Sequence, residues 1–110
     1  MNAFTVDAVD ARRLSSGEPW LEFVRSASLS AGLYVLQSGE TDLQTPHDED
    51  EIYVVVSGTA RFVADGDAVD VAAGTVLFVP AHEPHRFEDV HGPLRLVVVF
   101  APPESSADPA

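Results

Sequence analysis

The chain contains no cysteine and no lysine. Without cysteine, it can form neither a disulfide nor a metal site ligated by thiolates. Without lysine, it cannot carry the glycine-rich phosphate loop that ends in Gly-Lys. Its 6 basic residues are scattered arginines, against 18 acidic residues, and the net charge is −12. This balance argues against a nucleic-acid partner, because a phosphate-binding surface needs clustered basic residues.

Long hydrophobic runs are also missing. No stretch approaches the roughly 20 continuous apolar residues that a membrane-spanning helix needs, and the start, MNAFTVDAVDARR, lacks the pattern of a signal peptide. We therefore expect a cytoplasmic protein that does not bind membranes. With 110 residues, of which 45% are hydrophobic, the chain is long enough for one domain with its own core.

Short segments rich in β-forming residues recur along the chain and predict many strands. No segment has a sustained helical period, although residues 9–14 and a turn near residues 25–30 carry weak hints. The predicted strands cover residues 4–9, 20–24, 32–37, 52–56, 60–63, 68–71, 75–79, 85–89 and 94–100.

Glycine-containing turn signals separate several of these segments. They stand at Ser57-Gly58, Asp65-Gly66 and Ala73-Gly74. Many short strands joined by such turns are typical of an antiparallel sandwich or barrel. We predict an all-β domain over residues 20–101, preceded by an N-terminal arm (1–19) and followed by a flexible, proline-rich tail (102–110).

The segment 51–56 has two apolar faces. Glu51, Tyr53 and Val55 share one face, and the alternate positions on the other face are all aliphatic. The segment 96–100 has the same two-sided pattern. A second sheet, the N-terminal arm or a partner subunit would have to cover the outer face. We predict a homodimer on this basis.

Two polar residues are predicted to face the interior. Glu51 shares its face with Tyr53, and His85 shares its face with Phe87. An inward carboxylate is costly unless it is paired or bound to a metal. Taken alone, each residue is explained by an ordinary buried hydrogen bond.

Other side chains are assigned by their surroundings in the sequence. Asp48, Glu49 and Asp50 are predicted to form a solvated rim, because acids on a loop usually face water. Apolar residues predicted to line the interior are Tyr34, Leu36, Tyr53, Phe62, Phe87 and Val99.

Two spaced motifs, each bounded by a glycine turn signal, occur within residues 20–101. The first motif, Gly, five residues, His-x-His, three or four residues, Glu, six residues and Gly, is matched by Gly39, Thr45-Pro46-His47, Glu51 and Gly58. The second, Gly, five residues, Pro-x-Gly, two residues, His, three residues and Asn, is matched by Gly74, Pro80-Ala81-His82, His85 and Asp89. These motifs resemble those of the cupin superfamily, over about residues 20–101. The resemblance implies a small single-domain cupin, an antiparallel double-stranded β-helix or jelly-roll barrel.

The motifs depart from the family pattern at three positions. Thr45 replaces the first histidine, His82 replaces a glycine, and Asp89 replaces an asparagine. Gln44, beside Thr45, offers an amide oxygen that could replace the missing ligand. His82 is interpreted as a side chain at the rim, with a contact to substrate as the alternative.

The resemblance implies one divalent metal ion held by His47, Glu51 and His85, with Gln44 as a further candidate ligand. Two imidazoles and one carboxylate resemble the site of non-haem Fe(II) oxygenases, which leaves positions open for substrate. The ligands do not select among Fe, Mn, Ni, Zn and Cu. Tyr53 is the candidate catalytic residue, as a donor of a proton or a hydrogen bond to substrate.

Two functions remain open at this point. The first is an enzyme that acts on a small oxygenated organic molecule, by dioxygenase-like chemistry or by Lewis-acid isomerisation or elimination. The second is a non-catalytic cupin that binds or senses a small molecule or sugar, which the missing first histidine favours. The fold does not choose between them.

Overall fold

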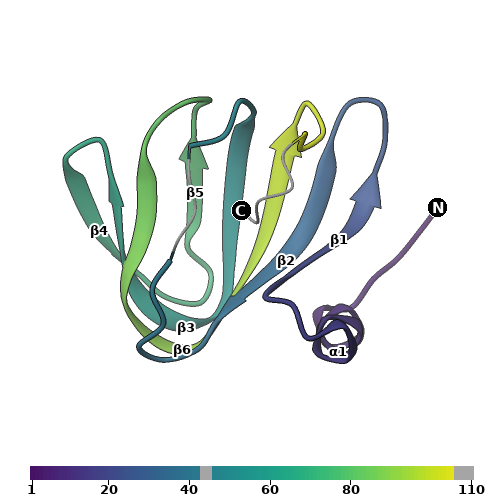
Figure 1. Ribbon diagram of the computed structural model, residues 1–110, viewed down its shortest axis with the longest axis horizontal. Helices are drawn as coiled ribbons and strands as arrows, with labels where there is room; N and C mark the ends of the chain where they lie inside the picture. Colours follow the sequence, from purple (N-terminus) through teal and green to yellow (C-terminus); the bar gives the residue numbers. More distant parts are fainter. Residues whose placement is uncertain (43–45, 106–110) are drawn as a thin grey trace.

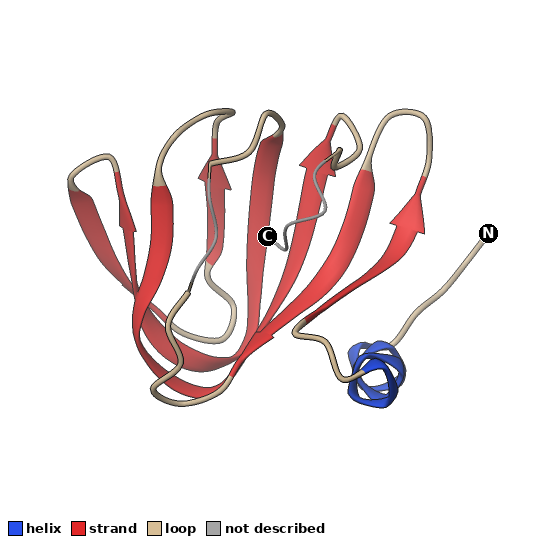
Figure 2. Ribbon diagram, in the orientation of Figure 1, coloured by secondary structure: helices blue, strands red, loops and turns tan. Residues whose placement is uncertain are grey.

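The computed structural model describes residues 1–42 and 46–105. In this part of the chain, one helix precedes a set of antiparallel strands (Figures 1 and 2). The elements are α1 (Val6–Ser16), β1 (Trp20–Arg25), β2 (Ser30–Leu36), β3 (Asp50–Ala64), β4 (Asp67–Val71), β5 (Val76–Val79) and β6 (His85–Ala101). The predicted all-β, double-stranded β-helix is confirmed.

The strands follow the order β1-β2-β6-β3-β4, and β5 pairs with β3. The two longest strands, β3 and β6, pair from Asp50 opposite Ala101 to Ala64 opposite His85, with shifts in register at the middle. Both strands bend there, so that their halves lie in different walls of the barrel (Figure 1). The predicted strands 52–56 and 60–63 are therefore the two halves of β3. Likewise, 85–89 and 94–100 are the halves of β6.

The bend explains why the predicted turn at Ser57-Gly58 is wrong. The chain continues in β3, and Gly58 has a φ of 83°. A Cβ atom at this position would lie 2.7 Å from the carbonyl oxygen of Pro93. Glycine is needed here because it tolerates both a positive φ and the close approach of another strand. The turns at Asp65-Gly66 and Ala73-Gly74 are confirmed.

The N-terminal arm forms helix α1, so the predicted strand over residues 4–9 is wrong. Thr5 caps the helix by accepting a hydrogen bond from the backbone N–H of Ala8, at 3.2 Å. Gly17 ends it in a left-handed conformation, with a φ of 77°. These two caps satisfy backbone groups that a short helix would otherwise leave exposed. Helix α1 has only a short apolar stripe, so the helical periodicity of its sequence is weak.

The main core lies inside the barrel, where inward-facing side chains of the strands meet. It contains Tyr34, Leu36, Tyr53, Val55, Phe62, Phe87, Leu94, Leu96, Val98 and Phe100 among others. The prediction that Val99 lines the interior is wrong. Its neighbours Val98 and Phe100 are fully buried there, and strand alternation turns Val99 to the outer face.

Helix α1 covers part of the outer face. Val9 packs with Leu33 and Val35 in a second apolar cluster, and Val97 lies against it. The N-terminal arm therefore accounts for one part of the two-sided pattern. Elsewhere on the outer face, Ile52 is 39% exposed and Phe78 is 62% exposed.

The first residues after β6 pack against the barrel. The backbone N–H of Glu104 donates to Ser30 Oγ at 2.8 Å, and its carbonyl accepts from Arg25. Glu104 is only 6% exposed. The described part of the tail therefore makes hydrogen bonds to the barrel, and the flexibility of the tail stays a prediction. Among the described residues, no helix has the length and apolar character to cross a membrane.

Candidate metal centre

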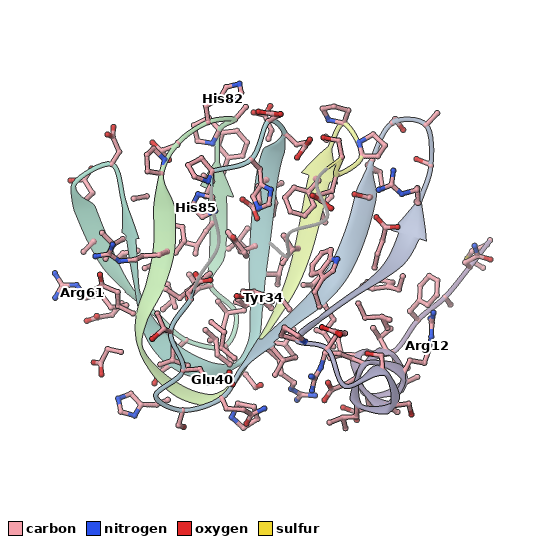
Figure 3. The ribbon with its side chains drawn as sticks, in the orientation of Figure 1. Arg12, Tyr34, Glu40, Arg61, His82 and His85 are labelled. Atoms are coloured by element: carbon pink, nitrogen blue, oxygen red, sulfur yellow. The ribbon has the colours of Figure 1, made fainter. Side chains whose placement is uncertain are left out.

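The loops that carry the two motifs lie against each other at one end of the barrel. The backbone N–H of His82 donates to the carbonyl of His47 at 2.8 Å, and that of Ala81 donates to the carboxylate of Asp50 at 2.9 Å. These bonds hold His47, which precedes β3, beside the start of β6. Figure 3 shows His82 at the outer edge of this end and His85 deeper in the barrel.

His82 has a left-handed backbone, with a φ of 70°. This conformation explains why the family pattern has glycine at this position. Its side chain is 72% exposed and lies 3.4 Å from the carboxylate of Asp48. The interpretation of His82 as a side chain at the rim is confirmed.

Glu51 and His85 meet in the interior from different strands. Glu51 pairs in the sheet with Val79 and Phe100, whereas His85 pairs with Ala64. Their side chains are each 1% exposed, and Glu51 Oε1 lies 3.0 Å from His85 Nε2. Their predicted inward orientation is confirmed. Their role as metal ligands stays a prediction.

The protonation of the His85 ring is set by its other nitrogen. His85 Nδ1 lies 2.8 Å from the carbonyl oxygen of Glu83. A carbonyl only accepts hydrogen bonds, so Nδ1 carries the proton. In the neutral ring, the lone pair of Nε2 therefore faces the carboxylate of Glu51. Two such electron-rich groups need a cation between them, either a proton or a metal ion.

The pKa of His85 reflects the same arrangement. Burial disfavours the charged ring, but the hydrogen bond to Glu51 and the carbonyl of Glu83 outweigh this effect. The pKa of His85 is therefore raised above its ordinary value. Beside Glu51, Nε2 therefore takes up a proton more readily than the ring of a free histidine does.

Tyr53, the candidate catalytic residue, lies at the same point. Its side chain is fully buried, and its hydroxyl oxygen is 3.1 Å from His85 Nε2. Its ring packs edge-on against Phe87, at a centroid distance of 5.0 Å. The structure thus brings together the hydroxyl of Tyr53, the carboxylate of Glu51 and the imidazole of His85.

His47 lies close to this group but slightly apart from it. It is 4% exposed, and its ring centroid is 6.3 Å from that of His85 and 4.9 Å from that of Phe100. Within the described chain, its Nε2 has no hydrogen-bond partner. An imidazole nitrogen that is buried without a partner is costly, and it fits a metal ligand.

The potential ligand atoms that converge most tightly are not those of the predicted triad. In the described residues, the group whose atoms all lie within 4.8 Å of one another is His47, Glu49 and Glu104. Glu49 was predicted to be solvated, but it is 4% exposed and accepts a hydrogen bond from Ser105 Oγ at 2.8 Å. Its neighbours Asp48 and Asp50 are exposed, as predicted.

Sequence reasoning missed Glu49 and Glu104 for different reasons. Glu49 lies two residues after His47 and two before Glu51, so an extended chain would place all three on one face. That alternation was a usable signal. Glu104 lies in a proline-rich polar segment, where nothing in the sequence indicates burial.

Gln44 and Thr45 lie outside the described residues. The proposed replacement of the missing histidine by Gln44 therefore stays a prediction. Among described residues, the buried nitrogen of His47 and the carboxylate of Glu51 suit a divalent ion with mixed nitrogen and oxygen ligands.

A cleft on the surface lies beside His85. Its volume is about 420 Å³, and its lining comprises Asp42, Pro46, Val63, Asp65, Gly66, Pro84, His85 and Arg86. This volume is within the range of pockets that hold small organic ligands.

Comparison with known proteins supports the motif assignment. The family model for the cupin domain matches residues 32–100. The chain is 44% identical over 105 residues to the uncharacterized protein SCO3923 of Streptomyces coelicolor, which covers 96% of this chain and 100% of that protein.

Solved structures share the fold at lower identity. KdgF from Halomonas sp. is 19% identical with a TM-score of 0.70, over 76% of this chain and 78% of that one. The DMSP lyase DddQ from Ruegeria pomeroyi is 24% identical with a TM-score of 0.64, over 77% of this chain and 42% of that one. The match to the cupin-domain model and the barrel together establish that this chain belongs to the cupin family.

Proposed function

We propose that this protein is a metal-dependent cupin that acts on a small oxygenated organic molecule. His47, Glu51 and His85 would hold one divalent ion, and Gln44 is a further candidate ligand. The observation that carries the proposal is the fixed tautomer of His85, which turns the lone pair of Nε2 toward a buried carboxylate. This arrangement is suited to a cation between the two groups.

The proposed chemistry is Lewis-acid isomerisation or elimination. When bound, a divalent ion with open positions would polarise a carbonyl or hydroxyl oxygen of the substrate. Tyr53 would supply a proton or a hydrogen bond to the substrate, because its phenol oxygen lies 3.1 Å from Nε2 of His85 and therefore beside the proposed ion. The name of one structural neighbour, a DMSP lyase, supports elimination as a reaction that this barrel can host.

Dioxygenase-like chemistry is the second candidate. Two imidazoles and one carboxylate form the ligand set of non-haem Fe(II) oxygenases. Measurement of O₂ uptake separates the two, because isomerisation and elimination consume no oxygen. A third candidate, a cupin that binds a small molecule without turnover, is supported by Thr45 at the position of the first motif histidine.

Metal analysis of the purified, untagged protein tests the proposal. We expect about one ion per chain of Fe, Mn, Ni, Zn or Cu, retained through gel filtration and lost in Glu51→Gln and in His85→Ala. Asp48→Asn is the matched control, because this exposed acid lies in the same loop. Metal-free wild-type protein that does not take up any of these ions would contradict the proposal.

We also propose that the protein acts as a cytoplasmic homodimer. On the outer face, Ile52 of β3 is 39% exposed beside Val76 and Phe78 of β5, each 62% exposed. Together these three side chains make an apolar patch that α1 does not cover. Light scattering should give twice the chain mass of 11.8 kDa, and Phe78→Asp should halve it. A monomeric wild type would refute the dimer.

A further inference from the structure

We propose that His47, Glu49 and Glu104 form a second divalent-cation site, which fastens the C-terminal segment to the loop of the first motif. The proposal goes beyond the function proposed above. Its two carboxylates differ from the carboxylate of that site. The neutral His47 ring has one lone pair, so when both ions are bound His47 serves the second ion, and Glu51 and His85 hold the first with Gln44 as its further candidate ligand. Glu49 comes from the loop before β3, and Glu104 comes from the segment after β6.

The geometry of the three side chains suits one ion. One potential ligand atom from each lies within 4.8 Å of the other two. Donors bound to the same ion at about 2.0–2.2 Å lie at most about 4.4 Å apart. Small rotations of these side chains would therefore bring them into a common coordination sphere.

Burial makes the cluster different from an ordinary group of surface acids. His47 and Glu49 are each 4% exposed, and Glu104 is 6% exposed. Two buried carboxylates this close repel each other unless a proton or a cation lies between them. Burial of like charges therefore favours a cation here.

Two atoms of the cluster have no hydrogen-bond partner within the described chain and are free to bind the ion. Ser105 Oγ donates to Glu49 Oε2 at 2.8 Å, but Glu49 Oε1 has no hydrogen-bond partner within the described chain. The same holds for Nε2 of His47. The guanidinium of Arg25 binds the carboxylate of Glu22 and the backbone carbonyl of Glu104, and its charge also acts on the carboxylate of Glu104. The unused positions that carry the argument are therefore Oε1 of Glu49 and Nε2 of His47.

The ligand types define the class of cation. One imidazole and two carboxylates suit Mn²⁺, Fe²⁺ or Zn²⁺, whereas Mg²⁺ and Ca²⁺ prefer oxygen ligands throughout. Ser30 already accepts a hydrogen bond from the backbone N–H of Glu104. The ion would add a second link, between the side chain of Glu104 and the loop before β3. Binding would stiffen the segment that follows β6.

Titration of the full-length protein with Mn²⁺, followed by electron paramagnetic resonance of the free ion, counts the sites. At saturating Mn²⁺ we expect two ions per chain in the wild type, of which only the one that depends on Glu51 is retained through gel filtration. Glu104→Gln and Glu49→Gln should each weaken one ion at least 10-fold, and Glu51→Gln should weaken the other. Asp48→Asn is the matched control, and circular dichroism checks that each variant folds.

The outcomes separate this inference from the proposed function. One ion per chain that depends on Glu51 but not on Glu104 overturns the second site and leaves the proposed function standing. One ion whose affinity falls in all three variants also overturns it. Loss of one ion in Glu104→Gln with no effect of Glu51→Gln supports the second site and contradicts the proposed function.

Hydrogen exchange gives an independent measurement. Mn²⁺ should slow exchange at the backbone amide of Glu104 at least 10-fold in the wild type and leave it unchanged in Glu49→Gln. Glu49 lies outside the measured peptide, so a difference between the two proteins requires a link between the loop and the segment. Equal protection in both proteins would overturn the proposal.

Discussion

Two buried carboxylates in this barrel have opposite surroundings. Asp42 accepts hydrogen bonds on both oxygens, from the Tyr34 hydroxyl at 2.8 Å and from the backbone N–H of Phe87 at 2.9 Å. Glu51 faces Nε2 of His85 at 3.0 Å, and its Oε2 has no hydrogen-bond partner in the described chain. Tyr34 lies near the middle of the barrel and His85 toward the end that carries His82 (Figure 3).

The difference separates an acid that holds the structure from one suited to bind a ligand. Neutral donors surround Asp42 completely enough to offset the cost of burying its charge. Oε2 of Glu51 keeps acceptor capacity that no donor among the described residues uses. Such a residue lowers the stability of the metal-free barrel and raises its affinity for a cation.

The largest expected effect is on stability, in Asp42→Ala. This change leaves the Tyr34 hydroxyl and the N–H of Phe87 buried without their acceptor, at a cost of about 1–3 kcal/mol each. We expect the free energy of unfolding to fall by about 3 kcal/mol in urea titrations. Asp48→Ala, at an exposed position, should change it by less than about 0.5 kcal/mol. Equal effects would contradict the comparison.

Glu51→Gln should mainly weaken metal binding, whereas Asp42→Ala mainly lowers stability. Loss of a charged ligand should weaken binding of the proposed metal on the order of 100-fold, or about 2.7 kcal/mol. Above the folded pKa of His85, where the ring is neutral, the stability of the metal-free protein should stay unchanged or rise, because a buried charge is removed. Calorimetric titration with Zn²⁺ and urea unfolding measure the two quantities. A large loss of metal-free stability would show that Glu51 is a structural residue like Asp42.

Tyr34→Phe sharpens the comparison with a smaller change. It removes one hydrogen bond to a charged acceptor, so the free energy of unfolding should fall by about 2 kcal/mol. Burial and the neighbouring Asp42 raise the pKa of Tyr34. Its phenol should therefore stay protonated in alkaline solution that ionises an exposed tyrosine. Absorbance at 295 nm checks this, and early ionisation of both tyrosines would contradict it.

The smallest expected effect is the pH dependence of the metal-free protein. The pKa of His85 is raised in the folded state, so its pairing with Glu51 stabilises the fold when the ring is protonated. This contribution is fully present below the unfolded value of about 6.5 and is lost as the pH rises through the higher folded value.

Metal binding should show the reverse trend, because the ion competes with the proton on Nε2. Unfolding measured between pH 5.5 and pH 8.5, relative to Glu51→Gln, tests the first trend, and Zn²⁺ titration tests the second. A difference in stability that grows with pH would contradict the pairing.

Much of the fold follows from local sequence signals, but the bends do not. The alternation in 51–56 and the spacing of the two motifs predicted which residues face inward. The cap residues Thr5 and Gly17 outweighed the weak periodicity of the arm, and the predicted strand there was wrong. The sequence predicted four short strands in place of β3 and β6, because each of these strands has a glycine near its bend and glycine is also typical of turns.

The sequence predicted which residue types form the candidate site, but it did not predict the distances between their side chains. Glu51, Tyr53 and His85 do meet, since strand parity alone turns them inward. Glu104 was out of reach, because its burial depends on a hydrogen bond to Ser30, which is distant in sequence. No local pattern encodes such a contact.

The contact between the two motif loops has a consequence for redesign. The carbonyl of His47, rather than its ring, accepts the N–H of His82. Any residue at position 47 would keep that carbonyl, so the imidazole can be exchanged without separating the loops. Side chains of the proposed metal centre can therefore be varied while the backbone that presents them is retained.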